Sequence, residues 1–239
     1  RQERLLKAAF ERKKKSSLMN ELVTASLPSR QTLAACARML GMRVAEPFNC
    51  FLVMVDQYKG QPREAWLDYQ EEYQRMTDSL VDELSDEACI TWASIDGVGI
   101  ICFGTPDAND AAEMKAQQMS QAKALLKTIA RNIPELVVSI GIAEGAETLT
   151  EIGKHYREAV VAARSGRKIW PQRRLHHYLD IGVFQVLPYI NDQKQINDYI
   201  ERTLGGLLQY EKKKKSDFIQ TLEIILSSDN LKEAADTLS

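Results

Sequence analysis

The sequence lacks most of the short patterns that mark enzyme active sites. It holds three histidines in 239 residues, and it has no Gly-x-Ser-x-Gly turn, no Gly-x4-Gly-Lys-Ser/Thr phosphate loop and no Gly-x-Gly-x-x-Gly segment. A serine or cysteine nucleophile needs a basic partner, and no such pairing is recognisable. These patterns give no positive evidence for an enzyme, and we expect no cofactor.

An excess of one charge and long apolar runs are also missing. Lysine and arginine number 31 against 33 aspartates and glutamates, so the net charge is -2 and no global basic field attracts nucleic acid or anionic lipid. The apolar runs, such as 50–55, fall far short of the roughly 20 residues that cross a bilayer. The chain begins with neither a methionine nor an apolar signal segment. We expect a piece of a longer cytoplasmic protein with no membrane contact.

The cysteines and histidines show no metal-ligand spacing. The four cysteines stand at Cys36, Cys50, Cys89 and Cys102. They form no Cys-x-x-Cys pair, so buried reduced thiols are the expectation. His176 and His177 are adjacent, and adjacent side chains of a strand point to opposite faces. The two rings then cannot serve one ion, and no metal site is expected.

Hydrophobic periodicity predicts the order of helices and strands. Apolar positions at steps of three and four predict helices, and short apolar or β-branched runs bounded by turn residues predict strands. The expected helices are 2–27, 30–40, 66–84, 107–131 and 150–165, and the expected strands are 48–55, 89–92, 99–103, 136–142 and, from a weaker signal, 176–178. Asp96-Gly97 lies between two of these strands and predicts a hairpin turn.

The order strand, helix, strand, strand, helix, strand is typical of the ferredoxin-like arrangement. Right-handed crossovers then place both helices on one face of an antiparallel sheet. We therefore predict an α+β fold with a main domain over 42–182. Linker helices for signalling and dimerisation precede it over 1–41, and a small all-helical unit follows over 183–239. Pro188 and Gly205-Gly206 are the expected breaks between its helices. Those helices are expected over 182–189, 192–204, 207–213, 217–226 and from 230 onwards.

Two segments resemble the GGDEF-type nucleotide cyclase fold, namely the Asp96-Gly97 hairpin and Met54-Val55-Asp56-Gln57-Tyr58-Lys59. Active members of that family hold two metal ions with an aspartate at the end of the first strand and with acidic residues of the hairpin. Here Met54 stands where the first of these aspartates would be, and a thioether is a poor ligand for Mg²⁺. The acidic pair of the hairpin is also missing. The resemblance implies an inactive remnant of a nucleotide site. Its residues are Asp56, Lys59, Asp96 and Gly97.

A basic patch follows in the sequence, because no acid stands between Ala159 and Leu179. The patch holds Arg164, Arg167, Lys168, Arg173 and Arg174. Clustered arginine and lysine bind an anion or the acidic face of a partner. Positive charge beside an edge strand also guards against pairing with other strands. The sequence leaves both interpretations open.

A further resemblance covers almost the whole chain and rests on three blocks of sequence. They are Ala37-Arg38-Met39-Leu40-Gly41 leading into Glu46-Pro47-Phe48, then His155-Tyr156-Arg157-Glu158-Ala159 to Ala162-Ala163-Arg164-Ser165-Gly166, then Thr203-Leu204-Gly205-Gly206-Leu207-Leu208-Gln209-Tyr210-Glu211. In this order they resemble the PucR/CdaR family of bacterial transcription regulators. The resemblance implies an upstream sensor domain, a degenerate GGDEF-like domain and a C-terminal helix-turn-helix.

The end of the chain resembles the first helix of that helix-turn-helix. Its residues are Asn230, Leu231, Ala234, Ala235 and Leu238. Asn230 is a suitable cap, and Glu233 stands three residues later, as in a capping box. The resemblance implies that DNA is contacted by a recognition helix beyond Ser239. Residues 192–239 hold seven basic and nine acidic side chains, so we expect this segment alone to bind DNA poorly.

The working hypothesis is a fragment of a transcription regulator that acts as a homodimer and is not an enzyme. Its GGDEF-like domain would pass a signal from the sensor to paired DNA-binding modules. We expect dimer contacts at Leu5, Leu18 and Leu22. Two alternatives stay open. The first is a module that senses a nucleotide or small molecule at the remnant site, and the second is an active nucleotide cyclase.

Overall fold

The computed structural model describes residues 2–25, 30–42, 44–58, 66–85, 89–104, 110–185, 193–214, 217–228 and 230–238. The chain divides into two compact units, Arg1–Gln185 and Val186–Ser239, and each is described by itself. None of the helices in the described ranges has both the length and the apolarity to cross a membrane.

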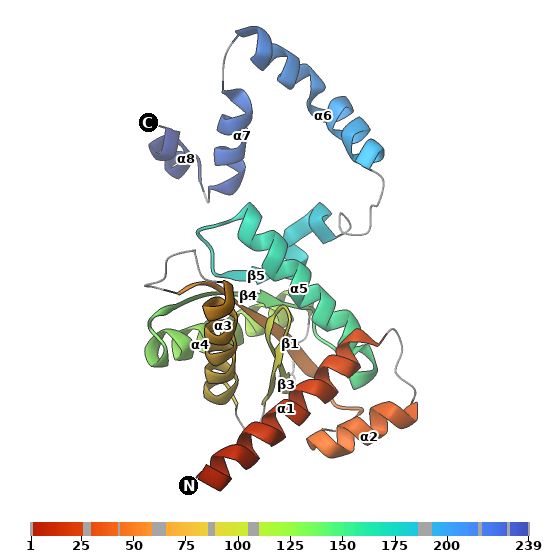
Figure 1. The fold of residues 1–239 in the computed structure, drawn as a ribbon. Helices are drawn as coiled ribbons and strands as arrows, with labels where there is room; N and C mark the ends of the chain where they lie inside the picture. The colour runs from red at the N-terminus through yellow and green to blue at the C-terminus, as the bar shows by residue number, and fades with distance from the viewer. Residues whose placement is uncertain are drawn as a thin grey trace. The chain divides into compact units, whose positions relative to one another are not determined.

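The first unit is built on a five-stranded sheet with the order β2-β3-β1-β4-β5 (Figure 1). The strands are β1 (Phe48–Tyr58), β2 (Cys89–Ser94), β3 (Gly97–Phe103), β4 (Leu136–Ile142) and β5 (Leu175–His177). The first four pair antiparallel in the ferredoxin-like order, which confirms the predicted α+β class. Strand β5 adds to β4 in parallel, so the complete sheet is mixed rather than antiparallel.

Helices cover both faces of this sheet (Figure 1). They are α1 (Gln2–Thr24), α2 (Arg30–Leu40), α3 (Trp66–Glu83), α4 (Ala111–Asn132) and α5 (Ile152–Ile169), with a short 3-10 turn η1 (Leu149–Glu151) before α5. Helices α3 and α4 share one face, as predicted for the crossover helices, and bury Leu80 and Ile129 against it. Helices α1, α2 and α5 cover the other face, where Met19 and Leu33 are buried. Burial on both faces explains the almost continuous apolar sequence of β1.

Two glycines allow the β2–β3 hairpin to pack closely. The hairpin is confirmed, with its turn at 95–96, one position earlier than predicted. Gly97 has a φ of 141°, and a Cβ there would lie 2.2 Å from the Val53 carbonyl oxygen. At Gly99 a Cβ would lie 2.2 Å from the Trp92 indole. The absence of both side chains lets β3 approach β1 and lets Trp92 pack against the Tyr156 ring.

The expectation of four reduced thiols is wrong for two of them. Cys89 and Cys102 form a disulfide between β2 and β3, whereas Cys36 and Cys50 are buried free thiols. The hairpin register places Cys89 directly opposite Cys102, with their Cα atoms 4.1 Å apart. A search for closely spaced cysteines misses such a pair, because the hairpin and not the sequence spacing brings the two together. Burial raises the pKa of the Cys50 thiol well above its usual value.

The C-terminal unit is helical, as predicted, but one predicted break is absent. Its helices are α6 (Gln193–Lys214), α7 (Phe218–Ser227) and α8 (Leu231–Leu238). Helix α6 runs through Gly205-Gly206, because a glycine lowers helix stability by only about 1 kcal/mol relative to alanine. Pro188, the other predicted break, lies outside the described residues. In the first unit, a 3-10 segment η2 (Tyr178–Gln185) replaces the start of the predicted helix 182–189.

Candidate functional site

Asp56 stands near the end of β1 and is almost completely enclosed by its own chain. Its side chain is 8% exposed. Arg167 Nη1 lies 2.6 Å from Oδ1, and Arg174 Nη1 lies 3.1 Å from Oδ2. The Ser139 hydroxyl of β4 donates a further hydrogen bond to Oδ2. Both carboxylate oxygens are therefore occupied by donors from β4, α5 and the residue just before β5.

Asp96 in the hairpin turn has a similar environment. Arg164 of α5 forms an ion pair with its Oδ1. The Tyr156 hydroxyl lies 3.2 Å from Oδ2 and 2.7 Å from the Ser94 hydroxyl. Burial raises the pKa of Tyr156 well above its usual value, so this hydroxyl stays protonated. The hairpin turn is therefore held to α5 by the Asp96–Arg164 ion pair and by the hydrogen bonds of the Tyr156 hydroxyl.

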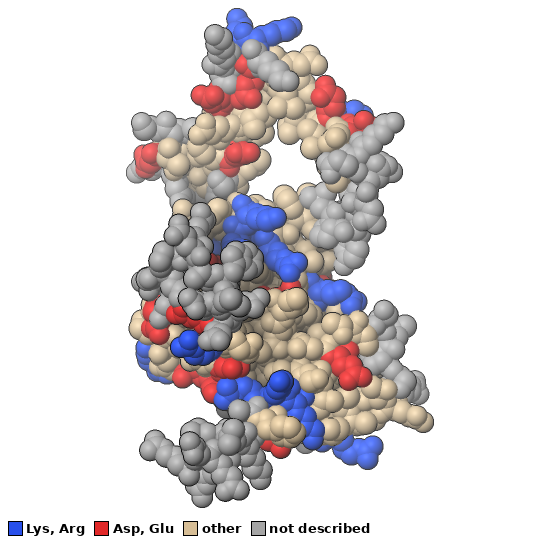
Figure 2. Space-filling model, viewed as in Figure 1, with Lys and Arg blue, Asp and Glu red and all other residues tan. Residues whose placement is uncertain are grey.

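The structure brings together two residue groups that the sequence presents separately. Three arginines of the predicted anion patch, Arg164, Arg167 and Arg174, contact the two predicted remnant carboxylates, Asp56 and Asp96. Figure 2 shows Lys and Arg side chains gathered over the C-terminal half of α5. We name the five residues of these ion pairs the arginine–aspartate cluster. The three arginines therefore form ion pairs within their own chain. Neither of the two interpretations of the patch from the sequence included such pairs.

The structure describes three of the four remaining residues of the predicted remnant site and anion patch. Arg173 stacks over the Trp170 ring at 5.0 Å from its centroid, and Lys168 is exposed. Gly97 sits against the backbone of β1, and Lys59 lies outside the described residues. Met54 is half-buried and packs against the core on the α1 and α5 face. Within the described ranges, no three His, Cys, Asp or Glu side chains gather as metal ligands.

The adjacent histidines point to opposite faces of β5, as predicted. His177 Nε2 lies 2.9 Å from Gln118 Oε1 of α4, whereas His176 packs under Gly166 of α5. Neither ring nitrogen of His176 has a hydrogen-bond partner among the described residues. Burial lowers the pKa of each histidine to about 4, and for His176 the nearby Asp56 opposes this shift. Both rings are therefore neutral at pH 7.

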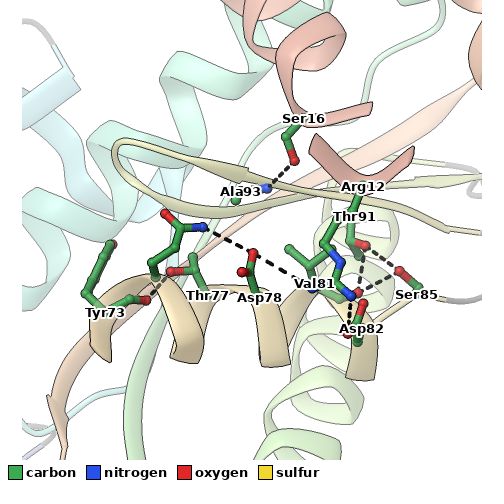
Figure 3. A network of polar contacts seen from close by, with 11 residues as sticks. Arg12, Ser16, Tyr73, Thr77, Asp78, Val81, Asp82, Ser85, Thr91 and Ala93 are labelled. Carbon is green, nitrogen blue, oxygen red and sulfur yellow. Dashed lines mark hydrogen bonds and ion pairs between the residues drawn. The ribbon is translucent and has the colours of Figure 1, made fainter. Parts of the chain in front are cut away.

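A second group of polar contacts fastens α1 to the sheet (Figure 3). The Ser16 hydroxyl accepts a hydrogen bond from the Ala93 N–H at 3.2 Å, and the Asn20 amide donates to the Ala93 carbonyl at 3.0 Å. Strand β2 is an edge strand, so α1 satisfies backbone groups that no neighbouring strand pairs. Arg12 lies 2.6 Å from Asp82 of α3. Sequence reasoning missed these contacts because Arg12 belongs to a charged run that reads as solvated.

The burial of α1 corrects one of the three predicted dimer contacts, Leu22, and leaves Leu5 and Leu18 as predictions. Leu22 is 1% exposed and belongs to the core of its own chain, so its side chain is not available to a partner. Leu18 is partly buried and packs against the same core. The side chain of Leu5 is not among those described. Of the described apolar side chains on α1, Phe10 is the one left exposed, at 66%.

The last helix, α8, holds the residues assigned to a helix-turn-helix. Ala234 is buried and Ala235 is exposed, and α8 packs against α7. Leu231 is 74% exposed, so it does not pack into a core within this unit. Asn230 immediately precedes the helix, and its carbonyl accepts a hydrogen bond from the Ala234 N–H. The side chain of Leu238 is not among those described.

Residues 25–165 match the family model described as the GGDEF-like domain. The chain is also similar to the DNA-binding transcriptional activator AdeR of Bacillus subtilis (strain 168), with 18% identity over 214 residues that cover 88% of this chain and 47% of that protein. It thus spans about half the length of this curated relative. Among solved structures it is similar to a regulator of polyketide synthase expression from Bifidobacterium adolescentis, with 9% identity, a TM-score of 0.44, and coverage of 94% of this chain and 76% of that one.

Proposed function

The chain belongs to the GGDEF-like domain family, and from this premise we propose that it is a non-catalytic domain that relays a signal within a transcription regulator. Its curated relative AdeR is a DNA-binding transcriptional activator, which supports the regulatory part of the proposal. The match covers 47% of AdeR, so the activity of the whole protein is part of the proposal.

The observation that carries the non-catalytic role is the arginine–aspartate cluster. Catalysis with divalent metal ions needs carboxylate oxygens that are open to the ion. Arg167 and Arg174 occupy the oxygens of Asp56. By the resemblance to the nucleotide cyclases, Met54 stands where the first metal-binding aspartate would be. A metal ion would have to displace two cationic side chains before it could bind, so the cluster favours a structural role for Asp56.

The relay that we propose starts at α1 and runs through contacts described above. Helix α1 forms hydrogen bonds with the backbone of Ala93 in β2. The side chain of the next residue, Ser94, forms a hydrogen bond with the Tyr156 hydroxyl of α5. The ion pair between Asp96 and Arg164 couples the same hairpin to α5 a second time. Helix α5 packs in turn against η2, which ends the first unit. A change in the position of α1 thus has a physical path to the segment that leads to the C-terminal helices.

The C-terminal part of the proposal concerns DNA. We propose that α8 is the first helix of a helix-turn-helix and that residues beyond Ser239 contact DNA. A homodimer would present two such modules to two half-sites. Because residues 192–239 carry more acidic than basic side chains, DNA binding by the present chain alone should be weak.

Incubation with GTP and Mg²⁺ tests the non-catalytic role against its alternatives. We expect no cyclic or condensed nucleotide product, measured by chromatography after hours at micromolar protein. The matched variant is Asp56→Ala, which removes the candidate metal ligand. Turnover by the unmodified chain that Asp56→Ala abolishes would contradict the proposal. Saturable GTP binding without turnover would instead favour the nucleotide-sensing alternative.

A further inference from the structure

An open groove of about 440 Å³ lies where α1, α2 and α3 meet. This volume falls in the range of pockets that hold small molecules, roughly 300 to 1,000 Å³. The groove does not involve the arginine–aspartate cluster. Figure 3 shows part of its wall, where Arg12 of α1 reaches Asp82 of α3 beside Val81 and Ser85.

Apolar side chains from all three helices line the groove. They are Leu18 of α1, Met39 and Leu40 of α2 and Val81 of α3. Met39 is 55% exposed, so the groove presents apolar surface to solvent. A ligand with an apolar body would bury this surface and gain the corresponding hydrophobic free energy.

One cationic side chain of the groove, Lys15, favours an anion. The lining holds three cationic side chains and two carboxylates, and a third carboxylate, Asp78, pairs with Arg12 from outside the lining, so the formal charges balance. Arg12 is already paired with Asp82 and Asp78. Lys15 is only partly exposed and has no ion pair with a described residue. Burial lowers the pKa of Lys15 below its usual value, because an enclosed ammonium group loses part of its hydration.

We propose that this groove binds a small amphipathic molecule with one negatively charged group, such as a medium-chain carboxylate, whose head pairs with Lys15 and whose apolar body covers Leu18 and Met39. The groove is walled by α1, α2 and α3, so a bound molecule would hold α1 against the domain. This consequence for the relay rests on the proposed function, whereas the binding itself does not.

Methyl NMR of the full chain with ¹³C-labelled methionines tests the proposal. Met39 reports from the groove, and Met119 of α4, on the opposite face of the sheet, is the internal reference. Octanoate is the probe, and octylamine and octanol match its tail with a positive and a neutral head. Lys15→Met removes the charge and keeps the apolar stem. The matched variant Lys123→Met removes an exposed lysine of α4.

We expect octanoate to shift the Met39 signal saturably without moving Met119. Its affinity should exceed that of both matched probes, and Lys15→Met should weaken it about tenfold while Lys123→Met leaves it unchanged. Equal binding of octylamine, equal shifts of Met119, or no shift at about 10 mM octanoate overturns the proposal. If Lys15→Met does not fold, the comparison of the three probes on the unmodified chain decides alone. A negative result would leave the GTP test unaffected.

Discussion

Truncation of Leu22 tests whether α1 belongs to the core of its own domain. Leu22 is 1% exposed and lies beside Met19 and Val23, where α1 contacts α5 and β2. Leu22→Ala removes most of a buried side chain and should destabilise the domain by about 3 kcal/mol, near the middle of the range for buried leucines. For a unit of this size, the melting temperature should fall by roughly 6 to 12 °C.

Urea unfolding followed by circular dichroism at two protein concentrations measures this change, and sedimentation velocity measures the oligomeric state of the same samples. The core position predicts a lower urea midpoint for Leu22→Ala at both concentrations and an unchanged oligomeric state. Phe10→Ala is the control on the same helix, because Phe10 is exposed and should change stability by less than about 0.5 kcal/mol. Conversion of Leu22→Ala from dimer to monomer, with the unfolding free energy unchanged, would refute the reasoning and restore Leu22 as a dimer contact.

Three further predictions concern packing, the disulfide and pH. Gly166→Ala should lower the melting temperature, because its Cβ would lie 2.3 Å from the His176 ring. Gly206→Ala, on open helix surface, should raise or preserve the melting temperature. Equal effects of the two substitutions would contradict the close packing of His176 against Gly166. Reduction of the β2–β3 disulfide should lower the unfolding free energy by about 3 kcal/mol, and a urea midpoint insensitive to reductant would exclude the bond. Because the pKa values of His176 and His177 are lowered to about 4 in the folded protein, the unfolded chain binds protons at a higher pH than the folded chain does. The contribution of these two histidines to the unfolding free energy should be complete above pH 6.5 and should decrease as the pH falls towards 4. A urea midpoint that stays constant between about pH 7 and 5 would be inconsistent with this prediction.

Elements with a strong local pattern were predictable from the sequence. Strand β4 and helix α2 begin and end at the predicted residues, because a dense apolar period and a flanking proline or glycine determine them locally. Helix α6 was not predicted as one helix, because the two glycines in its middle indicate a break, whereas the helix continues through them. A weak local signal for a turn is therefore overridden where the residues on both sides form a continuous helix.

The candidate site was predictable in its residues but not in its pairings. The aspartates and arginines of the arginine–aspartate cluster were both singled out, but Asp56 and Arg167 are separated by 111 positions. Only the paired strands and the close packing of α5 on β4 bring them together. The same holds for Arg12 and Asp82 and for the two bonded cysteines, since each contact is a product of tertiary structure. Leu22 has the spacing of an interface residue, and that spacing does not distinguish a partner chain from its own core.

Hydrogen–deuterium exchange tests the relay most directly. The double variant Ser16→Ala, Asn20→Ala removes two side chains that bond Ala93. Thr24→Ala is the control, because among the described residues the Thr24 hydroxyl bonds to the backbone of α1 itself. The relay predicts faster exchange in α1 and β2, and also in α5 and η2 and on into the C-terminal helices, for the double variant but not for Thr24→Ala. Faster exchange confined to α1 and β2, with η2 and the C-terminal helices unchanged, would contradict it.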